Sequence, residues 1–143
     1  AELLRYMKDK TIKDVKPLCT KTGGFVSLLG TSDARSVSDR AMDGDKTAKR
    51  AWDAMIYQII KYIGAMSTVL HGKVDGILLG GGMVYNKELV KQISEACSFI
   101  APVYAYPGEF EWEAMNAGTA RVLSGEETAR EYTGVPRWNG FEV

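Results

Sequence analysis

The longest regular pattern in the chain runs from Lys46 to about Leu70, where apolar side chains recur at steps of three and four residues. This spacing predicts one long helix with a single apolar face, longer than about 30 Å at the usual rise per residue. The positions on that face are Ala51, Met55, Ile59, Tyr62, Ile63, Met66 and Val69, widened by Trp52, Ile56 and Ile60. We expect this methionine and aromatic stripe to lie in the core.

A second pattern starts with a short apolar run, Ile77 to Leu79, that stops at three glycines, residues 80–82. A helical pattern follows, with Asn86 as its N-cap and an end near Cys97, so the unit is predicted as strand, glycine turn and helix. Another buried strand is predicted from Phe99 to Tyr106, and this order implies a parallel crossover. Such a glycine turn is a natural nucleotide site, although a tight connection explains the glycines equally well.

Shorter patterns predict the remaining elements of an α/β fold with a short, mostly parallel sheet flanked by helices. Further helices are expected at Glu2–Met7 and Thr11–Cys19, from Glu109 to Gly125, and at Glu126–Tyr132. Phe25–Leu29 is interpreted as a strand-like apolar run, His71–Gly72 as a helix terminus, and residues 134–143 as an irregular tail.

Composition narrows the function classes. The 143 residues carry 18 Lys and Arg against 18 Asp and Glu, so the balanced charge argues against a nucleic-acid partner. No apolar run approaches the roughly 18 residues of a membrane span, and no signal peptide is visible at the start. Cys19 and Cys97 match no metal spacing and predict a reduced, cytoplasmic protein with buried thiols. His71 is the only histidine in the sequence, so a metal site with several histidine ligands is not expected.

Candidate chemistry follows the apolar run at residues 25–29. Asp33 and Arg35 alternate, so in an extended segment their side chains would share one side. A carboxylate can accept from ribose hydroxyls, and a guanidinium can stack on a base or pair with phosphate. The alternative interpretation is a helix N-cap with a solvent salt bridge.

Three acidic residues, Glu109, Glu111 and Glu113, open the last long helical pattern. They suit the helix dipole, and they also suit a Mg²⁺ ion bound to phosphate. Both interpretations stay open at this point.

Four segments, taken together, resemble butyrate kinases in order and spacing across nearly the whole chain. Gly24–Arg35 resembles the family segment that ends in G-T-x-D-A-R, and Val74–Ile77 with Gly81–Gly82 resembles V-D-x-I followed by G-G. Phe99–Val103 with Tyr106–Glu109 is similar to F-I-A-P-V followed by Y-P-G-E, and Ala117–Glu127 is similar to the closing helix.

The resemblance implies the superfamily of acetate and sugar kinases, hsp70 and actin, with nucleotide between two ribonuclease H-like domains. Butyrate kinases transfer phosphate reversibly between ATP and butyrate, with Mg²⁺, as dimers or larger oligomers. Residues 1–143 are therefore expected to be a carboxyl-terminal nucleotide-binding lobe of the actin-like ATPase type, lacking the amino-terminal lobe.

Residue by residue, the resemblance implies a nucleotide site and a metal position. The implied nucleotide residues are Asp33, Ala34, Arg35, Gly81, Gly82, Met83, Val84 and Asn86. Val84 stands where related acetate kinases carry a glycine. The implied magnesium-associated residue is Glu111, with Glu109 second. The family's phosphate loop, carboxylate-binding arginine and catalytic aspartate have no match here, so no catalytic residue is assigned and the chain is expected to be inactive alone.

Two other functions remain open. One is a kinase for another short-chain carboxylate, such as isobutyrate, a branched acid or acetate. The other is a non-catalytic interaction module, with a partner surface around Trp52, Tyr57, Tyr62 and Trp112. The long helix at residues 46–70 is a candidate subunit contact. Only the kinase interpretation predicts nucleotide binding that is lost in Arg35→Ala.

Overall fold

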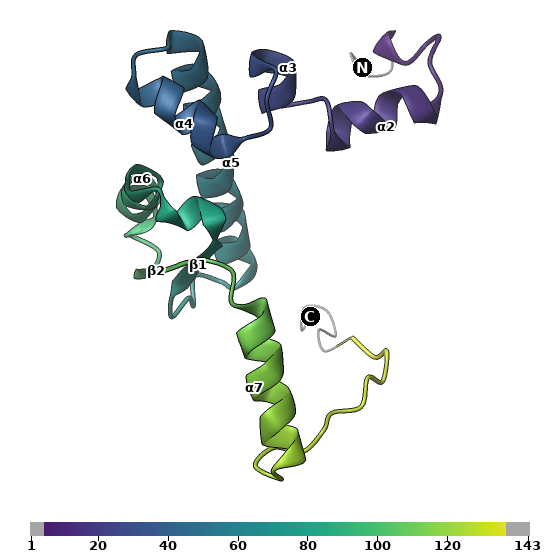
Figure 1. Ribbon diagram of the computed structural model, residues 1–143, viewed down its shortest axis with the longest axis vertical. Coiled ribbons are helices and arrows are strands. Elements are labelled where there is room, and N and C mark those ends of the chain that lie inside the picture. Colours follow the sequence, from purple (N-terminus) through teal and green to yellow (C-terminus); the bar gives the residue numbers. More distant parts are fainter. Residues whose placement is uncertain (1–4, 137–143) are drawn as a thin grey trace. The chain divides into compact units, whose positions relative to one another are not determined.

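The computed structural model describes residues 5–136, which form two compact units divided after Gly108 (Figure 1). In chain order the first unit contains α2 (Ile12–Thr20), α3 (Phe25–Leu29), α4 (Ala34–Met42), α5 (Lys46–Val69), β1 (Ile77–Gly81), the 3₁₀ turn η1 (Gly82–Tyr85), α6 (Lys87–Cys97) and β2 (Val103–Pro107). The second unit contains α7 (Glu111–Leu123). The predicted helix at residues 2–7 and the predicted irregular tail lie partly outside the described residues.

Helix α5 confirms the longest sequence pattern. Its N-cap is Asp45, whose Oδ1 accepts hydrogen bonds from the backbone N–H groups of Thr47 and Ala48 at 2.9 and 3.0 Å. The other oxygen accepts from Nε and Nη2 of Arg40 at 3.0 and 2.7 Å, which joins the end of α4 to the start of α5. The helix ends at Val69, and His71 and Gly72 follow with positive φ, so the predicted helix terminus is confirmed.

The two strands form a parallel pair, as the strand-helix-strand order predicts. Ile77 lies opposite Val103, and the register continues to Gly81 opposite Pro107. The second strand begins later than predicted, because a turn at Cys97–Ile100 precedes it. Beyond the pair, Gly81 and Gly108 exchange backbone hydrogen bonds at 3.1 and 3.3 Å, which closes the edge next to the glycine turn.

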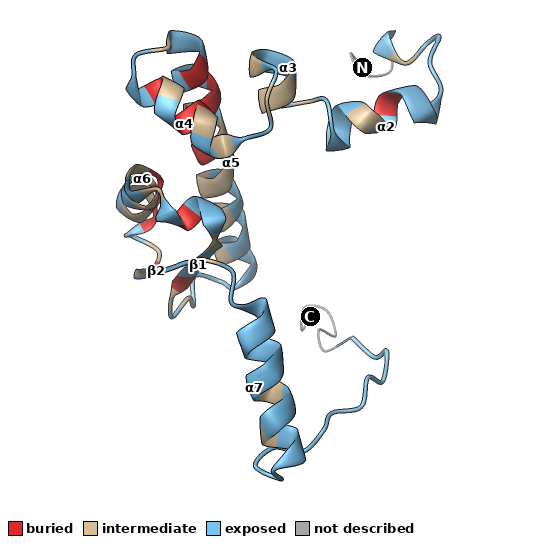
Figure 2. Ribbon diagram, in the orientation of Figure 1, coloured by how far each residue is buried: buried red, intermediate tan, exposed pale blue. Residues whose placement is uncertain are grey.

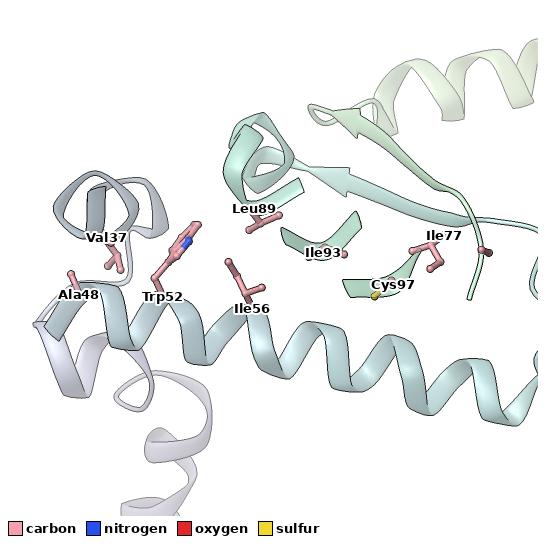
Figure 3. Close-up of a cluster of buried hydrophobic side chains, with 10 residues drawn as sticks. Val37, Ala48, Trp52, Ile56, Ile77, Leu89, Ile93 and Cys97 are labelled. Atoms are coloured by element: carbon pink, nitrogen blue, oxygen red, sulfur yellow. The ribbon is translucent and has the colours of Figure 1, made fainter. Parts of the chain in front are cut away.

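The core of the first unit lies where α4, the first half of α5, α6 and β1 meet (Figure 3). Its buried members are Val37, Ala41, Ala48, Trp52, Ile56, Ile77, Leu89, Ile93, Cys97 and Ala101. The Trp52 ring is the largest of the fully buried side chains and stacks on Phe25, with ring centroids 6.4 Å apart. Truncation of such a side chain to alanine typically costs about 3–5 kcal/mol.

The second half of α5 corrects one prediction. Tyr62, Met66 and Val69 are 65%, 56% and 53% exposed, so the stripe leaves the core towards the end of the helix. Other members of the stripe still pack against the core, among them Met55, Ile59 and Ile63. Figure 2 shows buried residues where α5 meets α4 and α6. The reason is that periodicity reports one apolar face, whereas burial also needs an element that covers that face.

The interpretation of Phe25–Leu29 as strand-like is wrong, because these residues form the one-and-a-half-turn helix α3. Gly24 and Gly30 flank it with φ of 60° and 72°, and the Gly30 N–H donates to the Val26 carbonyl as a C-cap. Phe25 and Leu29, four residues apart, both pack against the core. The run is too short to show a helical period, so tertiary packing determined its helical conformation.

The second unit holds α7, which carries no buried residue within the described range. The helix predicted at Glu126–Tyr132 is wrong, because no helix is present there. Gly125 takes φ of 80°, and Glu127 binds back to α7 through a backbone hydrogen bond and an ion pair to Arg121. Seven residues whose side chains all stay exposed cannot offset the cost of helix nucleation.

Two other sequence predictions are tested by burial. Cys97 is buried, and desolvation raises the pKa of its thiol, but Cys19 is exposed, so the prediction of two buried thiols is half wrong. Trp52 is 1% exposed and cannot belong to a partner surface, unlike Tyr57 and Trp112 at 65% and 80%. No helix among residues 5–136 is long and apolar enough to cross a membrane.

Candidate functional site

The first wall of the candidate site is the start of α4. Asp33 is its N-cap, with Oδ1 accepting the Arg35 backbone N–H at 3.0 Å, and the Asp33 N–H donates to Thr31 Oγ1 at 3.1 Å. The prediction of an extended segment is wrong, and the N-cap alternative is right about the backbone. On a helix Arg35 and Asp39 are four residues apart, so they share one face.

The second wall is the segment after β1. Gly81 ends the strand with φ of 91° and ψ of 178°, a conformation that is essentially restricted to glycine. Residues 82–85 then make a single 3₁₀ turn, and Asn86 caps α6 by accepting the Leu89 N–H at 2.9 Å. The predicted cap is confirmed, and the turn brings Gly82 and Met83 to the side of α4.

A side-chain hydrogen bond joins the two walls. Asn86 Nδ2 donates to Oγ of Ser38 at 2.6 Å, and Ser38 is buried. Both functional groups of the Asn86 amide therefore have protein partners. This makes Asn86 a residue that positions the walls.

The walls enclose a hollow of about 640 Å³, a size typical of small-molecule pockets. It is lined by Asp33, Ala34, Arg35, Asp39, Trp52, Gly82, Met83, Tyr85 and Asn86. Among the described residues, the Arg35 guanidinium and the Asp39 carboxylate form no hydrogen bond or ion pair, so both are available to a ligand. We call this hollow the α4–η1 pocket.

Six of the predicted nucleotide residues line this pocket, although they come from segments about 50 positions apart: Asp33, Ala34, Arg35, Gly82, Met83 and Asn86. Gly81 and Val84 do not line it, and Val84 is only 7% exposed because its side chain packs inward. Sequence reasoning missed Asp39, Trp52 and Tyr85. A helical interpretation of residues 34–42 would have found Asp39, one turn after Arg35.

The predicted metal residues lie elsewhere in the chain. Glu109 begins the second unit and Glu111 begins α7, and both side chains are exposed. No three His, Cys, Asp or Glu side chains in the described part of the chain are grouped as a metal site. Mg²⁺ bound to a nucleotide needs only one or two protein carboxylates, so their donor chemistry fits the ion.

A larger, apolar hollow of about 930 Å³ lies along α5. Phe25, Leu28, Met55, Ile59, Tyr62, Ile63, Met66, Leu70, Val74 and Ile100 are among the side chains that line it. Its lining carries no charged side chain, in contrast to that of the α4–η1 pocket. We call it the α5 groove.

Comparison with known proteins identifies close relatives. The chain is 46% identical over 128 residues to butyrate kinase 2 of Clostridium acetobutylicum, covering 90% of this chain and 35% of that protein. It is also 46% identical over 127 residues to a probable butyrate kinase 2 of Caldanaerobacter subterraneus subsp. tengcongensis, covering 89% and 36%. The chain therefore spans about a third of the length of these relatives. Residues 2–130 match the acetokinase family, and the chain belongs to this family, whose fold is that of the actin-like ATPases.

Proposed function

We propose that this chain forms the adenosine-binding part of a butyrate kinase, which transfers phosphate reversibly between ATP and butyrate. The observation that carries the proposal is the α4–η1 pocket, where Asp33–Arg35 and Gly82–Met83 face one hollow. The identity of 46% to butyrate kinase 2 supports this choice of carboxylate.

The chemistry of the lining suits the nucleoside end of ATP or ADP. Asp33 and Asp39 supply carboxylates that accept hydrogen bonds from ribose hydroxyls. The planar Arg35 guanidinium can stack on a base or pair with a phosphate. Nothing lies within 4 Å of a Cβ built on Gly82, so the backbone is open to a ligand there. Two carboxylates beside one cation make this a poor site for the full triphosphate charge.

The magnesium ion is proposed to be held by Glu111, with Glu109 as the second residue, together with nucleotide phosphates. When bound, Mg²⁺ supplies charge neutralisation on the transferred phosphate. The role of the two glutamates is to fix the ion through oxygen ligands at the start of α7. Glu111→Gln should weaken the Mg²⁺ dependence of ADP binding more than Glu113→Gln does.

The rest of the enzyme is proposed to supply the other side of the cleft and the carboxylate site. Phosphoryl transfer works by positioning and charge neutralisation, which requires both sides at once. We therefore expect this chain alone to bind ADP weakly and to form no butyryl phosphate. The complete enzyme is proposed to be a homo-oligomer, which light scattering would test.

The α5 groove supports this division, because an apolar hollow of about 930 Å³ suits burial against more of the same protein. Its proposed occupant is the part of a butyrate kinase that this chain does not match, about two thirds of the relatives' length. The unmatched part can be supplied from butyrate kinase 2. Met66→Glu in the groove should block binding of that part to this chain. Tyr57→Glu, at an exposed position of α5 outside the groove, should not.

Calorimetry with Mg-ADP tests the nucleotide proposal. We expect weak binding by the 143-residue chain, lost in Arg35→Ala and kept in Arg50→Ala, an exposed arginine that lines no part of the α4–η1 pocket. If a well-folded chain binds no ADP, the non-catalytic interaction module becomes the better interpretation. Once the unmatched part of a butyrate kinase is added, an assay of phosphate transfer to butyrate, isobutyrate and acetate would identify the carboxylate substrate.

A further inference from the structure

Trp52 combines complete burial with an unsatisfied donor. Its side chain is 1% exposed, and the indole Nε1–H has no hydrogen-bond partner among the described residues. Buried donors in native proteins are nearly always paired with protein, water or ligand. The unpaired indole donor therefore indicates that a group from outside the described chain completes it.

Trp52 lies both in the core and beside the candidate nucleotide site. Figure 3 shows the ring projecting from α5 between Val37 of α4 and Leu89 of α6. Trp52 also lines the α4–η1 pocket, and it is the most buried of its lining residues. The charged side chains that line the pocket, Asp33, Arg35 and Asp39, belong to exposed residues, in contrast to buried Trp52. The exposed part of the lining is thus charged, and its most buried member is aromatic.

A nucleotide has one apolar, planar end, the base, with hydrogen-bond acceptors on its edge. Its phosphates need cations or water and belong at the exposed part of the lining. We propose that the indole N–H of Trp52 donates to a ring nitrogen of the purine, which makes Trp52 a specificity-determining residue. This inference rests on the proposed function, because it assigns the base of the same nucleotide to the most buried part of the same pocket.

The indole nitrogen has almost no exposed surface, so a base reaches this donor only when neighbouring side chains move. Met83 lines the same pocket and is 43% exposed. Its unbranched side chain changes rotamer easily, so the proposal assigns this movement to Met83.

The first experiment uses Trp52→Phe, which keeps an aromatic ring and removes the donor, with Trp112→Phe as the matched control on α7. Loss of one hydrogen bond should weaken Mg-ADP binding about three- to tenfold. Each of 1-deaza-, 3-deaza- and 7-deaza-ADP lacks one ring nitrogen of the purine. The analogue that lacks the acceptor of this bond should bind the wild type more weakly than ADP does, by the same factor. Trp52→Phe should bind that analogue and ADP equally well. Equal affinity of Trp52→Phe and the wild type for ADP would overturn the inference while leaving the proposed function intact.

The second experiment needs no variant for its readout, which covers the case that Trp52→Phe folds poorly. In the ¹⁵N-labelled chain, the indole proton of Trp52 should move downfield and exchange more slowly on addition of ADP. Ribose 5-phosphate, which lacks the base, should leave it unchanged. An equal response to ribose 5-phosphate would overturn the assignment to the base. Absence of ADP binding to the wild type would overturn the proposed function and this inference together.

Discussion

The side-chain amide of Asn86 and the hydroxyl of Ser38, 48 positions apart in the sequence, are joined by a hydrogen bond of 2.6 Å. The bond links α4 to the N-cap of α6, beside the pocket that both segments line. Ser38 is 3% exposed, so the bond is shielded from water and more sensitive to loss than a surface bond. One side chain therefore caps a helix and sets the spacing of the two pocket walls.

Asn86→Ala should lower the free energy of unfolding by about 1–3 kcal/mol, because it removes the cap and leaves the Ser38 hydroxyl without its donor. Ser38→Ala keeps the cap and should cost less. Urea denaturation of both single variants and the double variant would measure the coupling, expected at about 0.5–1.5 kcal/mol. Strict additivity of the two substitutions would show that the bond contributes nothing.

Gly81→Ala should destabilise the chain by about 1–3 kcal/mol, because Gly81 has φ of 91° and ψ of 178°. Gly80→Ala and Gly82→Ala are the matched controls, since neither has φ in the left-handed range and neither added Cβ meets an atom within 4 Å. Thermal melts would compare the three variants. A Gly81→Ala melt that coincides with both controls would contradict a strained role for this position.

Acid should destabilise the first unit through Asp45. Backbone donation from Ala48 and the Arg40 guanidinium hold the pKa of Asp45 below its ordinary value of 3.8. A depressed folded-state pKa adds stability that is complete above the unfolded pKa and is lost as pH falls through the folded value. The melting temperature should therefore fall as pH drops below about 4.

Asp45→Asn is the variant that isolates this effect, because asparagine also caps helices but does not ionise in this range. Its melting temperature should be lower near neutral pH and should depend less on acid than that of the wild type. Asp14, whose pKa is lowered by hydrogen bonds from Thr11, remains as a second source of acid sensitivity. Parallel acid curves for Asp45→Asn and the wild type would rule out Asp45 as a contributor.

The two cysteines should differ in reactivity. Cys19 is exposed, whereas Cys97 is buried and desolvation raises the pKa of its thiol, which lowers the thiolate population. Brief treatment of the native chain with iodoacetamide should add one label, located at Cys19 by peptide mass spectrometry. In denaturant both cysteines should react. Rapid labelling of native Cys97 would show that α6 opens from the core.

The sequence by itself determined those parts of the fold that depend on local chemistry. Asp45, Asn86 and the repeat of apolar residues through residues 46–69 determine helix ends and faces, because caps and periods act within a few residues. The parallel pairing of the strands follows from the order strand, helix, strand. Four short motifs were also enough to indicate the family that residues 2–130 match.

Tertiary structure decided the rest, since burial and pairing depend on residues far away in the chain. Phe25–Leu29 became a helix because it packs on Trp52 and the core, and residues 126–132 stayed irregular because their side chains remain exposed. Val84 was expected at the ligand but is buried, whereas Asp39 and Trp52 joined the pocket when α4, α5 and η1 came together. A linear sequence lists donors and acceptors, but only the folded chain shows which buried donor, the indole N–H of Trp52, lacks a partner among the described residues.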